Sequence, residues 1–184
     1  MTTLFGKAIV FSTLTTTATI YAASKYSENL EFIKPITLLN DTPPVFQRIV
    51  KTPRRSTQWG LWSRPITQKH ASLEAISQAL FGSTAYKLEL LLSNAKEKAS
   101  AFKQTPGSKL GNMVVLLRPS EDEVIYEYKA EPDFDFIMYL GIDRCEHECR
   151  VNLGFVDWSD SQVQHLGERV YTPLLLDSAA RGLK

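Results

Sequence analysis

The stretch DFDFIMYLGIDRCEHECRVNLGFVDW, residues 133–158, decides the fold class of this chain. Apolar side chains recur at every second position on both sides of its centre, at Phe134, Phe136, Met138, Leu140 and Ile142 and again at Val151, Leu153 and Phe155. A period of two residues predicts strands that turn one face to a core. Residues 144–148 lie between the two patterned runs and are predicted to be the tip of an antiparallel hairpin.

The hairpin tip, RCEHEC at 144–149, contains both cysteines and one of the three histidines. Cys145, His147 and Cys149 are three zinc ligands, but a structural zinc site usually has four ligands and a C-x2–4-C pair. A Cys145–Cys149 disulfide would fit a short hairpin and would matter only in an oxidising compartment. A Cys–His nucleophile has no glycine-rich oxyanion loop beside it here, and Glu146 and Glu148, which would raise the basicity of His147, also disfavour a thiolate. Two ordinary thiols at an exposed turn are therefore the favoured interpretation.

The sequence before the hairpin predicts two more strands and a helical region. Residues 112–117 (NMVVLL) and 123–129 (EVIYEYK) are predicted strands joined by a turn at 118–122, which makes a meander with the central hairpin. Upstream, apolar residues recur at helical spacing from Leu73 to Leu80, with Thr67 or Ser72 as the N-cap. The pattern resumes at 85–99, which predicts two helices, or one bent helix, meeting at Gly82.

Residues 159–184 predict a long closing helix. Ser159 or Asp160 is a suitable N-cap, Gly182 a suitable C-terminal cap, and Pro173 predicts a kink. The apolar stripe predicted to face the sheet consists of Val163, Leu166, Val170 and Leu174.

The predicted fold is α+β, with an antiparallel sheet of four to six strands packed against the long C-terminal helix. Residues 45–184 are predicted to form a single α+β domain, preceded by a linker at 27–44. Within the domain, alternation at 45–51 (VFQRIVK) predicts a first strand. Pro53, Gly60 and Pro65 then predict a loop over 52–65, which would place Trp59 and Trp62 outside any regular element.

Residues 1–26 are predicted to be a hydrophobic anchor or signal. The run from Ala8 to Ser24 carries no charge and lies between Lys7 and Lys25, so a single-pass membrane anchor through 8–24 is expected. Its hydroxyl residues can bond back to helix carbonyls. Alternatives are a secretory signal cleaved after Ala22-Ala23-Ser24, which would give a secreted protein, and a helix packed on the domain. A mitochondrial presequence is disfavoured because the first arginine is Arg48.

Charge and motifs exclude several classes of function. The formal net charge of the 184-residue chain is +1, which gives no basic surplus for nucleic-acid binding. The chain has no G-x-G-x-x-G, P-loop, H-E-x-x-H or G-x-S-x-G motif, so neither a cofactor nor a metal is expected. His70 and Glu74, and His165 and Glu168, are spaced for proton transfer, but such pairs are more often solvated helix faces.

Aromatic residues crowd the predicted strands and suggest a pocket for an apolar molecule between the sheet and the closing helix. Tyrosines there could orient a ligand, and a buried carboxyl group could act as an acid or base. The candidate catalytic residues are Tyr126, Tyr139, Asp135 and Asp157, and the candidate ligand-binding residues are Phe136, Trp158 and Tyr128.

Three stretches, the hydrophobic N-terminus, LEAISQALFGSTAYKLELLL (73–92) and ERVYTPLLLDSAARGL (168–183), together resemble a group of small proteins from filamentous fungi. Some of that group are encoded among specialised-metabolite genes. The order strand, helices, antiparallel sheet and C-terminal helix also resembles the START-like helix-grip fold and its polyketide-cyclase relatives. The resemblance implies a cofactor-independent cyclase or isomerase acting on a hydrophobic polyketide- or terpenoid-like molecule. The alternatives are a membrane-associated protein that binds a lipid or other hydrophobic ligand without catalysis, and an assembly partner in a membrane complex.

Overall fold

The structure is a computed structural model that describes residues 33–52, 57–68, 71–87, 104–110, 113–128, 136–146, 148–158 and 162–183. Of residue 110 and residues 162–167 only the backbone is described. The predicted hydrophobic N-terminal helix, most of the helix predicted at 85–99, and the N-caps Ser159 and Asp160 lie outside these ranges. Among the described residues, no helix combines the length and the apolar character needed to cross a membrane.

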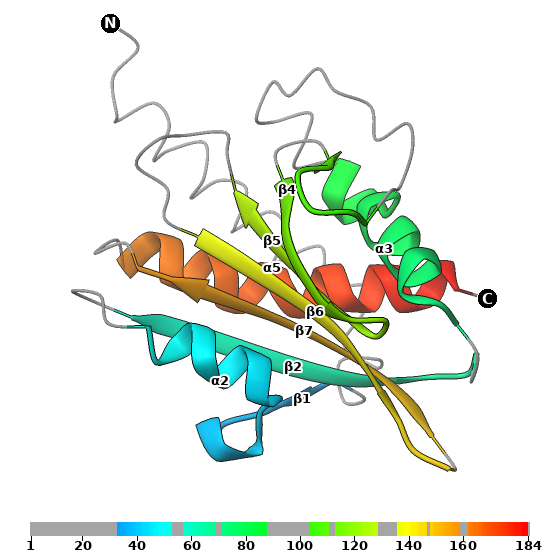
Figure 1. The fold of residues 1–184 in the computed structure, drawn as a ribbon, viewed down its shortest axis with the longest axis horizontal. Helices are drawn as coiled ribbons and strands as arrows, with labels where there is room; N and C mark the ends of the chain where they lie inside the picture. The colour runs from blue at the N-terminus through cyan, green and yellow to red at the C-terminus, as the bar shows by residue number, and fades with distance from the viewer. Residues whose placement is uncertain are drawn as a thin grey trace, which may run out of the picture.

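An antiparallel sheet of seven strands forms the centre of the molecule, in the order β1-β2-β7-β6-β5-β4-β3 (Figure 1). The strands are β1 (Lys34–Pro35), β2 (Gln58–Ile66), β3 (Lys109–Leu110), β4 (Met113–Ser120), β5 (Glu123–Tyr128), β6 (Phe136–Arg144) and β7 (Cys149–Asp157). The α+β class and the antiparallel sheet are confirmed. The sheet exceeds the predicted four to six strands because β1 and β3 have two residues each, too few to show a period.

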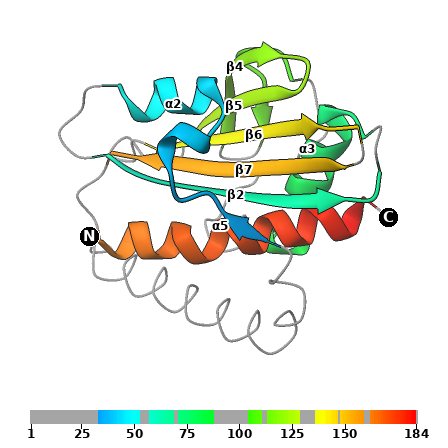
Figure 2. The ribbon, with the colours of Figure 1, turned by 90° about the horizontal axis from the view of Figure 1, so that it is seen from below.

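Helices cover both faces of the sheet. Helices α3 (Leu73–Phe81) and α5 (Gln162–Gly182) pack on one face, and α2 (Pro44–Val50) packs on the other, as the edge-on view shows (Figure 2). A large core cluster fills the α3–α5 side and includes Met138, Leu153 and Leu176. A smaller cluster fills the α2 side and includes Phe46, Leu61 and Val156. We call these the α5 face and the α2 face of the sheet.

The central hairpin forms as predicted. Strands β6 and β7 pair from Phe136↔Asp157 to Arg144↔Cys149, and the Cys145 N–H donates to the Glu148 carbonyl across the tip at 2.9 Å. The predicted apolar positions that the structure describes in these two strands all belong to the core cluster on the α5 face: Phe136, Met138, Leu140, Ile142, Val151, Leu153 and Phe155. The strands β4 and β5 complete the meander on one side of this hairpin.

Helices α3 and α5 also form where the pattern predicted them. Ser72 caps α3 by accepting a hydrogen bond from the Ala75 N–H at 3.1 Å, and the helix ends at Phe81 with Gly82 as its C-cap. The predicted stripe of α5 is wrong where it can be checked, since Val170 and Leu174 are only half-buried. The buried positions include Glu168, Thr172, Leu175 and Ala179. Glu168 and Thr172 are polar residues on the buried side of the helix, so the spacing of apolar residues alone predicted the wrong face as the interface.

The strand predicted at 45–51 is wrong, because Pro44–Val50 is helix α2. Proline is pre-organised for the first position of a helix, and Pro44 occupies that position. Phe46, Ile49 and Val50 are three and four residues apart, so they share one face and pack together on the sheet. A seven-residue run is too short for period two to exclude period 3.6.

The loop predicted at 52–65 is also wrong over most of its length, because Gln58–Ile66 is strand β2. Pro65 is tolerated because β1 pairs only with Ser63 and Trp62, so within the described part of the chain the outer edge of β2 has no strand partner at Pro65. Part of the predicted linker at 27–44 also joins the sheet. Lys34 and Pro35 form β1, and the Ile36 N–H donates to the Leu61 carbonyl at 2.8 Å.

Candidate functional site

The structure separates the two candidate catalytic tyrosines onto opposite faces of the sheet. Tyr126 pairs across β5 and β6 with Met138 and belongs to the core of the α5 face. Tyr139 pairs with Ile125 and belongs to the core of the α2 face. Since the sheet lies between them, these two hydroxyl groups do not meet in one site.

The Tyr126 hydroxyl is held in a buried polar network. It lies 2.9 Å from Ser77 Oγ on α3 and accepts from Gln104 Nε2 at 3.3 Å. Gln104 Nε2 also donates to Ser77 Oγ and to the Leu73 carbonyl. Burial raises the pKa of Tyr126 above its ordinary value. The ring is fully buried, so this hydroxyl joins α3 and residue 104 to the sheet rather than facing a ligand.

The Tyr139 hydroxyl has a different environment, on the α2 face. It donates to Glu123 Oε1 at 2.9 Å, and Ser120 Oγ donates to the other carboxylate oxygen at 3.1 Å. The ring packs edge-on against Phe46, with ring centroids 5.5 Å apart. Burial, and then the negative charge of Glu123, raise the pKa of Tyr139 above its ordinary value. This hydroxyl is therefore a donor that anchors Glu123.

Four aromatic rings form a continuous row across the α5 face. Trp62 stacks on Phe155 at 5.8 Å, Phe155 on Phe136 at 6.3 Å, and Phe136 meets Tyr128 edge-on at 6.4 Å between ring centroids. These rings come from the adjacent strands β2, β7, β6 and β5. Phe155 and Phe136 are buried, whereas Trp62 and Tyr128 are half-buried. We call these four residues the aromatic row, and both of its ends reach the surface.

Asp157 lies at one end of β7, beside the aromatic row. Its register partners are Phe136 and Gln58, and the alternation of β7 puts it on the same face as Phe155. Its exposed fraction is 0%. A fully buried carboxyl group next to stacked rings is suited to serve as an acid, a base or a polar anchor for a ligand.

The aromatic row contains two of the predicted site residues, Tyr128 and Phe136, and a third, Asp157, is the register partner of Phe136. It does not include Tyr139 or Trp158, both of which belong to the core on the α2 face. Asp135 lies outside the described residues. The prediction missed Trp62 because it placed that residue on a loop. Gly60 and Pro65 are typical of a loop, so no local signal placed Trp62 on a strand.

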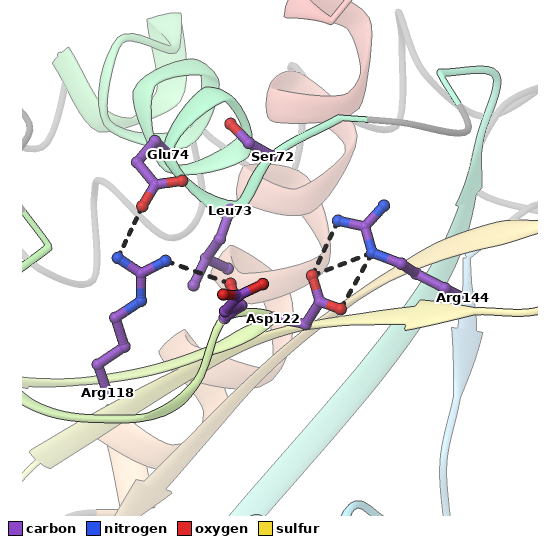
Figure 3. Close-up of a pocket in the computed structure, with 7 residues that line it drawn as sticks. Ser72, Leu73, Glu74, Arg118, Asp122 and Arg144 are labelled. Carbon is purple, nitrogen blue, oxygen red and sulfur yellow. Dashed lines mark hydrogen bonds and ion pairs between the residues drawn. The ribbon is translucent and has the colours of Figure 1, made fainter.

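A separate, charged hollow lies at the opposite end of the sheet, where α3 begins (Figure 3). Its volume is about 290 Å³. Its lining consists of Ser72, Leu73, Glu74, Arg118, Glu121, Asp122 and Arg144, which come from α3, β4, the β4–β5 turn and β6. None of the predicted site residues lines it.

Both arginines of this hollow form ion pairs with acidic residues that line it. Arg144 donates to both carboxylate oxygens of Asp122, at 2.8 to 3.0 Å, and to the Ala71 carbonyl at 2.9 Å. Arg118 pairs with Glu74 at 2.7 Å and donates to the Glu121 carbonyl at 3.3 Å. Figure 3 shows both guanidinium groups directed at acidic partners. These hydrogen bonds and ion pairs therefore join the start of α3 to the β4–β5 turn and the end of β6.

The hairpin tip provides neither a disulfide nor a described metal site. Cys145 is exposed, Cys149 is buried, and both are free thiols. Cys145 stands opposite Glu148 and Cys149 opposite Arg144, so alternation turns the two thiols to opposite faces of the ribbon. Burial raises the pKa of the Cys149 thiol, which disfavours a nucleophilic thiolate. No group of three potential metal ligands occurs among the described residues, which do not include His147.

In comparisons with known proteins, no protein family, curated protein or solved structure matches this chain.

Proposed function

We propose that this domain binds an apolar molecule on the aromatic row of the α5 face. The observation that carries the proposal is the row itself, whose four rings are in contact across four strands while its two ends remain half-buried. Aromatic rings offer a large apolar contact area with little conformational entropy to lose. Asp157 supplies a polar group that could orient a ligand at one end of the row.

Residues 8–24 are proposed to hold the domain at a membrane. The run is uncharged, and lysines lie on both sides of it. A binding protein for an apolar molecule gains from this position, because the molecule dissolves in the bilayer far better than in water. Cleavage of the same segment as a secretory signal, giving a secreted protein, is the competing proposal.

A cofactor-independent cyclase or isomerase is the second candidate, and Asp157 is the observation that favours it. A buried carboxyl group beside an apolar surface can move a proton to or from a ligand held there. Tyr126 and Tyr139 no longer support this candidate, because their hydroxyl groups are bonded to Ser77 and Glu123. The test is whether the protein converts a polyketide- or terpenoid-like substrate. If Asp157→Asn abolishes that conversion but still binds the substrate, the protein is an enzyme and not only a binding protein.

A START-like helix-grip arrangement is proposed for the fold. Its support is the chain order: β2 pairs with the last strand β7, α3 follows β2, the meander follows α3, and α5 closes on the sheet. Membership of the fungal group named above is proposed on the same order of elements, together with the hydrophobic N-terminus.

Photolabelling tests the binding proposal. The full chain in lipid nanodiscs would be irradiated with a neutral alkyl diazirine, and the labelled residues would be identified by mass spectrometry. Saturable labelling is expected on β2 and β5 at Trp62 and Tyr128. Tyr128→Ser should reduce it roughly threefold to tenfold, the contribution of one aromatic contact.

Leu117→Ser is the matched control for this experiment. Leu117 is 50% exposed on β4 and lies outside the aromatic row, so its loss should leave labelling of the row unchanged. The proposal would be contradicted if labelling concentrates on Leu116 and Leu117 or does not saturate at the row. Either result would mean that the probe reacts non-specifically with exposed apolar side chains and does not occupy a binding site.

A further inference from the structure

We infer that the domain makes a second contact with the membrane, through a basic surface that binds the headgroups of anionic phospholipids. The surface consists of Lys34 on β1, Leu38 just before η1 (Leu39–Asp41), and Arg48 and Lys51 at the end of α2. All four side chains are exposed, and we call these four residues the basic surface. The inference rests on the proposed anchor at 8–24, because the anchor would keep the domain beside a bilayer.

The positive charge of the basic surface is not compensated within the described part of the chain. None of Lys34, Arg48 and Lys51 forms an ion pair there. Asp41 is the one acid between residues 34 and 52. The surface therefore presents an excess of exposed cations, in a chain whose formal net charge is only +1.

The fold gathers these residues at the β1 edge of the sheet. Lys34 pairs with Ser63, and Leu61, two residues earlier on β2, belongs to the core on the α2 face, so alternation turns Lys34 to that face. Gln47 Nε2 on α2 donates to the Thr42 carbonyl at 2.8 Å, which joins α2 to the end of η1. Figure 1 shows this segment in blue and cyan at one margin of the molecule, on the far side from α3.

Acidic residues of the α2 face lie farther from this edge. Glu123 and Asp143 are on β5 and β6, and both strands come after β7 in the order that begins at β1. The α2 face therefore has a basic margin at β1 and α2 and carries acids toward the other side of the sheet. A charge separation of this kind would orient the domain at a negatively charged surface, with the β1 edge toward it.

An anionic bilayer is the partner that this surface fits. Lys34 follows Ser24, the last residue of the proposed anchor, by ten residues, and ten residues extend at most about 35 Å. Anionic lipid headgroups attract lysine and arginine side chains near the membrane surface. Leu38 is 63% exposed and supplies an apolar side chain that can enter the headgroup region. Because the anchor holds the domain at a high effective concentration, a contact made by three cations is sufficient.

This contact would also bring one end of the aromatic row close to the lipid. Trp62, the half-buried end of the row on β2, pairs with Pro35, the residue after Lys34. A domain that docks with its β1 edge on the bilayer therefore places the Trp62 end of the row beside the phase in which an apolar ligand dissolves.

Lysine footprinting of the full chain in lipid nanodiscs tests the inference. Acetic anhydride, a neutral reagent, would acetylate exposed lysines, and mass spectrometry would give the rates at Lys34, Lys51 and Lys109 in the same molecules. Lys109 is the internal control, because it is exposed on β3 at the opposite edge of the sheet. Where about a third of the lipid is phosphatidylserine, Lys34 and Lys51 should react at least about threefold more slowly than on phosphatidylcholine alone, with Lys109 unchanged. Salt at about 0.5 M should remove this protection while the anchored chain stays on the nanodiscs.

Charge reversal assigns the protection to the basic surface. Arg48→Glu should restore the rates of both lysines on anionic nanodiscs to within about 1.5-fold of their values on phosphatidylcholine, because it removes an attraction and adds a repulsion. Arg169→Glu is the matched control, since Arg169 is exposed on α5, on the other side of the sheet, and should leave the protection unchanged. If circular dichroism shows that R48E does not fold, K51E takes its place, with Lys34 as the readout.

The inference and the anchor fail in different ways. Equal rates on the two kinds of nanodisc, slowing that includes Lys109, or protection that survives in the folded charge variant would overturn the basic surface. A chain that does not co-purify with phosphatidylcholine nanodiscs would overturn the anchor. Protection of Lys34 and Lys51 on anionic nanodiscs would in that case still support the basic surface.

Discussion

Gly60 and Gly154 leave room for large aromatic side chains to pack against the backbone of the sheet. A Cβ atom on Gly60 would be 2.4 Å from the Trp62 ring and 2.8 Å from the Phe155 ring, so the first stack of the aromatic row exists because residue 60 has no side chain. A Cβ on Gly154, on the other face, would be 2.9 Å from the Phe46 ring. These glycines allow Trp62 and Phe46 to approach the backbone of the sheet.

Tyr139 should give the stability of the protein a specific dependence on alkaline pH. Its pKa is raised in the folded state by burial and by Glu123, so the folded state holds the phenolic proton more tightly than the unfolded state does. The stability that this provides is complete below the ordinary tyrosine pKa of about 10 and is lost as the pH rises above it. Above about pH 10 the unfolding free energy should therefore fall less steeply with pH in Tyr139→Phe than in the unchanged protein.

Urea unfolding at a series of pH values from about 8 to 11 checks this expectation. The values near pH 8 serve as the internal control, because there both forms of residue 139 are neutral and the difference reports only the lost bond to Glu123. Parallel curves for the two proteins above pH 10 would show that Tyr139 does not hold its proton in the fold.

At the scale of elements, sequence periodicity located most of the structure but failed in the segment before α3. The meander and α3 have regular patterns that one buried face imposes, whereas the pattern of α5 located the helix but not its buried face. Helix α2 has seven residues, so its spacing fitted two periods equally well. Strand β2 contains Gly60 and Pro65, two residues that are typical of a loop. They fit a strand here because aromatic rings pack over Gly60 and because the partner strand β1 is too short to reach Pro65. Those are tertiary facts that no local pattern contains.

Phe46 should account for most of the attachment of α2. It is the one residue of this helix that is fully buried, and it contacts both Trp59 and Tyr139 edge-on. Phe46→Ala should lower the free energy of unfolding by about 3–5 kcal/mol, because it removes a buried aromatic ring and leaves a cavity. Urea denaturation at neutral pH measures the change.

Leu38→Ala is the control for Phe46→Ala, since Leu38 is 63% exposed just before α2 and its loss should change the free energy by less than about 0.5 kcal/mol. A similar small effect from Phe46→Ala would mean that α2 contributes little to the core on its face.

For the whole molecule, the candidate site could be predicted only in part. Tyr128, Phe136 and Asp157 were identified because aromatic and acidic residues on predicted strands are the natural lining of an apolar site. Tyr126 and Tyr139 lie on different strands, and which face each occupies depends on how those strands pair. Single-sequence periodicity gives each strand its own alternation but not the phase between strands, so it could not separate the two tyrosines.

The proposed anchor predicts how the full chain partitions. Residues 8–24 carry no charge, so the full chain should pellet with membranes and remain there at high salt, since apolar insertion is not screened as surface charge is. A chain that begins at Ser27 should remain in the supernatant as a folded protein. Ultracentrifugation of cell lysates with immunoblotting compares the two. Full chain in the supernatant at low salt with an intact N-terminus would contradict the anchor, and a mature N-terminus near Lys25 would indicate a cleaved signal.

The central claim is that the aromatic row is the binding site, and the three tryptophans of the chain test it most directly. Trp62 belongs to the row, whereas Trp59 and Trp158 pack with the core on the opposite face. In ¹⁹F NMR of the 5-fluorotryptophan-labelled full chain in lipid nanodiscs, assigned with single Trp→Phe variants, titration with the neutral apolar probe 2-neopentylnaphthalene should move the Trp62 resonance saturably. The other two resonances should stay in place. Movement of Trp59 or Trp158 with Trp62 unchanged would place the site on the α2 face and contradict the account.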